Sequence, residues 1–102
     1  MTDNNIRTAV FLSVQRALVG SPAPEIRAVS LDLSRGKIVI SVYHDGVASD
    51  QLHEGVAEII TEVLADVPEG QEVVSSLVRS DAPGPVPLRG DPVFAVKGTT
   101  FR

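Results

Sequence analysis

Two histidines, each followed by an acid, are the residues best suited to chemistry in this chain. His44 precedes Asp45, His53 precedes Glu54, and Asp50 lies between the two pairs. These side chains could together ligate one metal ion, but their spacing matches no recognised motif such as HExxH, in which two histidines share a helix face. The chain has no cysteine, which excludes a disulfide framework, a zinc ribbon and thiol catalysis. We therefore predict no metal site.

The serines and glycines also lack a catalytic or nucleotide-binding pattern. Ser41, His44 and Asp45 could be drawn as a triad, but no serine stands in a G-x-S-x-G elbow. The glycines form neither a Walker motif nor a dinucleotide-binding fingerprint. Nucleic-acid binding is not expected either, because the net charge is −4 and only four residues are aromatic. The sequence predicts a binding protein without catalysis, without a cofactor and without a nucleic-acid ligand.

Acidic residues form the strongest pattern in the sequence. Between Ile38 and Val78 there is no lysine or arginine, and eight acids fall in that stretch, whereas the remainder of the chain holds all nine basic residues. Five of these acids recur at every fourth position: Asp50, Glu54, Glu58, Glu62 and Asp66. We call these five residues the acidic ridge. On a helix they are neighbours, and each like-charged pair costs about 0.2–0.5 kcal/mol.

Two interpretations of the acidic ridge remain open at this point. It is either a solvated face that keeps a small protein in solution, or a surface that attracts a partner with a basic surface. A nucleic-acid-cleaving enzyme is one such partner, because its cleft must attract phosphates. Under the second interpretation the predicted partner contacts are Tyr43, His44, Asp45, Asp50, Glu54, Glu58 and Glu62.

The hydrophobic spacing predicts the elements that position these residues. Predicted helices span residues 4–19 and 49–66, and predicted strands span residues 26–33, 37–43, 71–79 and 93–97. Ser49 is a suitable N-cap for the second helix. Gly36 can supply the turn of an antiparallel hairpin between the first two strands. Phe11 falls on the apolar arc of the first helix, so we expect its ring in the core.

The order α-β-β-α-β-β predicts one α+β domain over residues 1–102. In this two-layer sandwich both helices cover one face of a mainly antiparallel four-stranded sheet. We expect the other face to be open, with the side chains of Ser30, Asp32, Ser41, Tyr43 and Ser76. Residues 81–92 contain four prolines and predict a stiff connection to the last strand. No run approaches the roughly 18 apolar residues of a membrane span, and no signal peptide is recognisable.

Five runs of the sequence carry a family resemblance: ALVG (17–20), IRAVSLDL (26–33), ISVYHDGVASD (40–50), TEVLADVP (61–68) and LVRSDAPGPVPLRG (77–90). The chain resembles a set of small bacterial proteins associated with the immunity proteins of polymorphic toxin and contact-dependent growth inhibition systems. This resemblance implies a cytoplasmic protein that neutralises one cognate toxin domain and has no chemistry of its own. The alternative is a homo-oligomeric interaction domain, for example a homodimer formed through the edge of the last strand.

Overall fold

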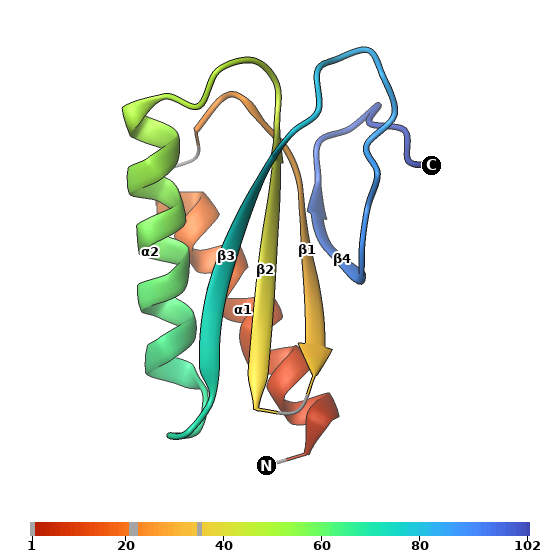
Figure 1. The fold of residues 1–102 in the computed structure, drawn as a ribbon. Coiled ribbons are helices and arrows are strands. Elements are labelled where there is room, and N and C mark those ends of the chain that lie inside the picture. The colour runs from red at the N-terminus through yellow and green to blue at the C-terminus, as the bar shows by residue number, and fades with distance from the viewer. Residues whose placement is uncertain (1, 21–22, 35) are drawn as a thin grey trace.

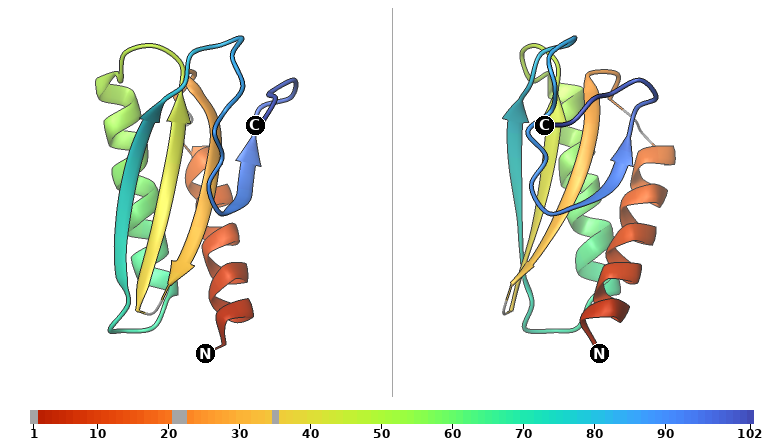
Figure 2. Two further views of the ribbon diagram at one scale, coloured as in Figure 1. Left: turned by 45° about the vertical axis from the view of Figure 1, so that its right-hand side comes forward. Right: turned by 90° about the vertical axis from the view of Figure 1, so that its right-hand side faces the viewer.

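The computed structural model of the protein describes residues 2–20, 23–34 and 36–102 (Figure 1). Its elements are α1 (Asp3–Gly20), β1 (Ile26–Ser34), β2 (Lys37–His44), α2 (Asp50–Asp66), β3 (Glu72–Arg79) and β4 (Asp91–Ala95). Both helices lie on one face of the sheet, as the two views of Figure 2 show. The predicted α+β class, its order of elements and its two layers are confirmed. Neither of the described helices has the length and apolar character of a membrane span.

The sheet is mixed, with the strand order β3-β2-β1-β4. β1 pairs antiparallel with both β2 and β4, whereas β2 and β3 are parallel. The parallel pair arises because α2 connects β2 to β3, and a helical crossover returns the chain in the same direction. Two of the three pairings therefore agree with the expected antiparallel sheet. The last strand, β4, lies at one edge of the sheet and β3 lies at the other.

The main core lies between the helices and the sheet. β1 is buried at six consecutive positions from its first residue, because it is paired on both sides and covered on both faces. On α1, Val10 and Val14 are fully buried, but the expectation that Phe11 belongs to the core is wrong, since it is 46% exposed. Phe11 lies at the border of the apolar arc, and Ser13 takes the buried position on the side that faces α2.

The sheet face away from the helices is partly covered, contrary to the expectation that it is open. The proline-rich segment (residues 81–90) and the chain end reach this face, as the right-hand view of Figure 2 shows. Ala28, Tyr43 and Val86 form a second small core there. Tyr43 is only 1% exposed, and its hydroxyl accepts a hydrogen bond from the backbone N–H of Arg89 at 2.9 Å.

Ser30 is buried in the same place, with its Oγ 3.2 Å from the Tyr43 hydroxyl. The prediction of an open face fails because the proline-rich segment does more than lead to β4: it lies across the sheet. Arg27 holds it there by donating from Nη1 to the carbonyl oxygens of Ser80 at 2.9 Å and Gly84 at 2.7 Å. Of the remaining residues on this face, Ser41 and Ser76 are partly exposed and Asp32 is exposed.

Gly90 ends the proline-rich segment in a conformation that other residues rarely adopt. Its φ is +80°, and a Cβ at this position would lie 2.4 Å from the carbonyl oxygen of Leu31 on β1. The segment therefore turns into β4 with its backbone directly against β1. Only glycine satisfies both the left-handed conformation and the close approach.

We expect Gly90→Ala to lower the free energy of unfolding more than a glycine replacement at an open turn. A left-handed conformation costs an alanine about 1–2 kcal/mol, and the contact with Leu31 adds to that cost. Gly70→Ala is the matched control, because Gly70 has a φ of +90° and a Cβ added there would meet nothing within 4 Å. Urea unfolding of both variants measures the difference. Equal losses would contradict the role given to the contact with β1.

Candidate functional site

Helix α2 carries the acidic ridge, and its start is fixed to the sheet by hydrogen bonds. Ser49 is the N-cap, as predicted, and its side chain accepts from the backbone N–H of Leu52 at 3.1 Å. The backbone N–H of Ser49 donates to Oε2 of Glu25 at 3.1 Å. Hydrogen bonding to Ser49 lowers the pKa of Glu25, so this carboxylate stays charged and ties the helix start to the chain before β1.

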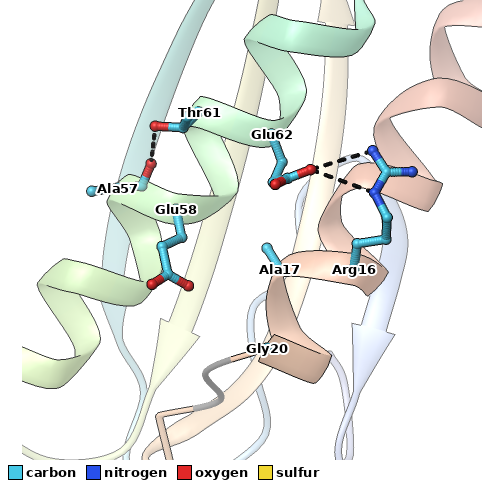
Figure 3. Close-up of a pocket in the computed structure, with 7 residues that line it drawn as sticks. All are labelled: Arg16, Ala17, Gly20, Ala57, Glu58, Thr61 and Glu62. Atoms are coloured by element: carbon cyan, nitrogen blue, oxygen red, sulfur yellow. Dashed lines mark hydrogen bonds and ion pairs between the residues drawn. The ribbon is translucent and has the colours of Figure 1, made fainter.

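The acids of the ridge do not form a straight row. Residues four apart are displaced by about 40° around a helix axis, because a turn contains 3.6 residues. Towards the end of α2 the ridge has therefore rotated to face α1. There Arg16 donates from Nη2 to Oε2 of Glu62 at 3.4 Å and forms an ion pair with Asp66. Figure 3 shows Arg16 and Glu62 facing each other across the two helices.

Asp66 is held by a second partner on α1. The buried Ser13 donates from Oγ to Oδ2 of Asp66 at 2.7 Å. Hydrogen bonds from Ser13 and Arg16 lower the pKa of Asp66, and the carboxylates of Asp66 and Glu62 raise the pKa of Arg16. The last two acids of the ridge are therefore paired with α1, where one arginine offsets one of their two negative charges. The sequence of α2 contains no lysine or arginine that could pair with these acids. The pairing with Ser13 and Arg16 of α1 was therefore not predicted.

The other three acids of the ridge remain exposed. We call Asp50, Glu54 and Glu58 the outer acidic patch. Within residues 2–20, 23–34 and 36–102, none of the three makes an ion pair. Their repulsion is relieved only by solvent and salt. The ridge is thus divided into two acids that are paired with α1 and three acids that have no ion-pair partner among the described residues.

A groove between the two helices adjoins the outer acidic patch. It has a volume of about 320 Å³ and is lined by Arg16, Ala17, Gly20, Ala57, Glu58, Thr61 and Glu62 (Figure 3). The groove exists because both helices carry small residues here: Ala17 and Gly20 on α1 and Ala57 on α2. In Figure 3 Glu58 lies beside the last turn of α1, without an interaction to the other residues drawn. The groove therefore combines an apolar floor with an unpaired carboxylate.

Two of the predicted contact residues, Tyr43 and His44, are buried and do not form part of this surface. Tyr43 lies under the proline-rich segment, and His44 is 5% exposed at the end of β2. The prediction assumed that the end of β2 was open, whereas the segment that covers Tyr43 comes from a distant part of the sequence. Nδ1 of His44 has no hydrogen-bond partner among the described residues.

Asp45 is exposed, and its carboxylate forms a hydrogen bond that stabilises the loop after β2. Its Oδ1 accepts from the backbone N–H of Ala82 at 3.2 Å, while Gly46 donates its N–H to Oδ1 of Asp81 at 2.8 Å. Hydrogen bonds from Arg79 and then from Gly46 lower the pKa of Asp81. These contacts join the turn after β2 to the start of the proline-rich segment.

The two histidines lie on different elements, His44 at the end of β2 and His53 in the exposed part of α2. In the part of the chain that the structure describes, no group of three or more His, Asp or Glu side chains could hold a metal ion. The geometry thus provides an exposed, negatively charged surface on α2 and no assembled metal centre in the described residues.

Comparison with known protein families gives a match that covers most of the chain. The model of a family described as MafI2 immunity protein matches residues 7–95, from the first turns of α1 to the last residue of β4. The matched region therefore includes the whole acidic ridge and the proline-rich segment. The chain has no significant match among curated proteins.

We expect Ser13→Ala to reduce stability at neutral pH more than in acid. The lowered pKa of Asp66 means that its folded-state interactions stabilise the protein above the usual aspartate pKa and are lost as the pH falls through the folded-state value. Removing the hydroxyl raises the pKa of Asp66 towards its usual range. The variant should therefore be less stable than the wild type at neutral pH, and the difference should shrink at about pH 2.

Urea unfolding at both pH values and an NMR titration of the Asp66 carboxyl measure this effect. Thr61→Ala is a suitable control, because the Thr61 hydroxyl donates to the carbonyl of Ala57 within α2. A stability difference for Ser13→Ala that is the same at both pH values would show that the hydroxyl acts through packing and its hydrogen bond to the carbonyl of Ala9, and not through Asp66.

Proposed function

The chain belongs to the MafI2 immunity protein family, and from this premise we propose that it neutralises a cognate toxin domain by binding it through the outer acidic patch of α2. The partner surface that fits this patch is basic. A toxin that cleaves nucleic acid has such a surface, because its cleft must attract phosphates. Covering that cleft blocks the substrate without any catalysis by the immunity protein, and in this scheme the neutralisation takes place in the cytoplasm.

The observation that carries this proposal is that only part of the acidic ridge has an ion-pair partner among the described residues. α1 supplies Arg16 to Glu62 and Asp66, while the three acids of the outer acidic patch keep their charge and their mutual repulsion. Each such pair of neighbours costs about 0.2–0.5 kcal/mol. A partner with a basic surface removes this cost on binding. Complementary charge also accelerates the encounter and selects the partner.

The groove beside the patch supports a basic partner on a second ground. A lysine or arginine side chain has an apolar stem and a charged end. The floor of the groove offers Ala17 and Ala57 to the stem, and Glu58 offers a carboxylate to the charged end. Arg16 also lines the groove, but it is paired with Glu62, so Glu58 is the lining carboxylate that is left for the charged end of a partner side chain.

A second candidate function is self-association through β4. Three exposed apolar side chains lie near this edge of the sheet or at the chain end: Phe11 at 46%, Val96 at 45% and Phe101 at 43% exposure. Phe11 also borders a hollow with Pro92 and Val93 of β4. Apolar residues beside an edge strand favour pairing with a second copy. Light scattering at high protein concentration tests this candidate, and a strict monomer excludes it.

We expect the double variant Glu54→Lys with Glu58→Lys to associate with the cognate toxin domain at least about tenfold more slowly at low salt. The reason is that the patch then repels the basic surface it attracts in the wild type. The matched control is Glu69→Lys with Glu72→Lys, which changes the net charge equally at exposed positions outside α2. Stopped-flow association with the toxin domain encoded beside the gene, at low and high salt, provides the measurement.

The two levels of the proposal give separate outcomes in this experiment. If the wild-type protein forms no complex and leaves the toxin active, the immunity function itself is wrong. If the wild type binds and both double variants slow association equally, only net charge matters and the outer acidic patch is not the contact. Replacing the two glutamates should also raise the stability slightly, because it relieves repulsion along α2.

A further inference from the structure

A second hollow lies on the sheet face opposite the helices. It has a volume of about 320 Å³ and is lined by Ser41, Tyr43, Ser76, Val78, Pro87, Arg89 and Arg102. Ser41 on β2 and Ser76 on β3 are cross-strand partners, and Tyr43 and Val78 form the next pair on the same face. Side chains at such partners lie about 5 Å apart. The floor of the hollow is therefore a pair of neighbouring hydroxyls beside an apolar row.

Two arginines complete the hollow from the other side. Arg89 comes from the proline-rich segment and Arg102 from the chain end. Neither makes an ion pair with any of the described residues, whereas Arg7, Arg16 and Arg79 all do. Asp32 is on the same face of β1, one pair beyond Ser30 and Ser41, and no ion pair joins it to either arginine. Two exposed arginines thus line the hollow without an ion-pair partner among the described residues.

Backbone hydrogen bonds hold both arginines at the hollow. The N–H of Arg89 donates to the buried Tyr43 hydroxyl at 2.9 Å. The N–H of Arg102 donates to the carbonyl of Val86 at 3.2 Å, and Val86 in turn donates to the carbonyl of Thr100 at 2.8 Å. Only the two side chains remain free to adjust.

From this arrangement we infer that the hollow binds an oxyanion of the phosphate class. Guanidinium groups bind phosphate and carboxylate oxygens through paired N–H donors, and serine hydroxyls can donate to further oxygens. Here the donors come from three directions: the strands, the proline-rich segment and the chain end. This arrangement suits a tetrahedral anion better than a planar carboxylate. The site does not depend on the acidic surface of α2, which lies on the other side of the sheet.

The test is an NMR titration of the full chain with inorganic phosphate at constant ionic strength, observing the arginine Nε–H and backbone signals. We expect saturable shifts at Arg89 and Arg102. Arg89→Gln and Arg102→Gln should each weaken phosphate binding about tenfold or more, the loss typical of a hydrogen bond to a charged group. Lys97→Gln is the control, because it removes the same charge from an exposed position that does not line the hollow.

Ser76→Ala gives a second readout that leaves the charge unchanged. It should weaken phosphate binding without affecting the shifts produced by high chloride. Methyl phosphate in place of phosphate shows whether the occupant is the free anion or the end group of a larger phosphomonoester. The inference is overturned if phosphate produces no saturable shift, if Lys97→Gln weakens binding as much as the arginine variants, or if acetate binds as tightly as phosphate.

Discussion

The rotation of the acidic ridge around α2 determines which charges the protein neutralises and which it presents. A spacing of four residues advances about 40° beyond a full turn, so five acids cannot all face the same way. The end of the ridge reaches Ser13 and Arg16 on α1, and the start does not. Glu62 and Asp66 therefore join the two helices, and because they are paired there, only the first three acids of the ridge belong to the outer acidic patch. An unpaired acidic patch follows from the geometry of the helix together with a single arginine.

The local pattern was sufficient to predict the elements, and it failed where distant segments meet. Each helix and strand was located to within about two residues, because periodicity and caps are properties of neighbouring residues. The parallel pairing of β2 with β3 follows from the crossover helix between them. The cover over Tyr43 could not be predicted in this way. It depends on Arg27, which binds Ser80 and Gly84, more than fifty residues further along the chain.

The same distinction applies to the residues that were predicted as partner contacts. Exposure of Asp50, Glu54 and Glu58 follows from the apolar stripe of α2, which the sequence displays directly. Burial of Tyr43 depends on the proline-rich segment, and pairing of Glu62 depends on α1. Ser13 did carry a signal, since it is a polar residue on the apolar arc of its helix. A polar side chain in such a place requires a partner, and the acidic end of α2 provides one.

The outer acidic patch on α2 and the two unpaired arginines lie on opposite sides of the sheet, which limits the electrostatic effect of one on the other. Among the described residues, the ion pairs use Arg7, Arg16 and Arg79, and the outer acidic patch, Arg89 and Arg102 have no ion-pair partner. At physiological salt the Debye length is about 8 Å. The smallest dimension of the molecule is 19 Å, so charges on opposite faces are largely screened from each other. A basic partner approaching α2 therefore meets the full negative patch, and an anion approaching the sheet meets two arginines, although the net charge alone would indicate repulsion.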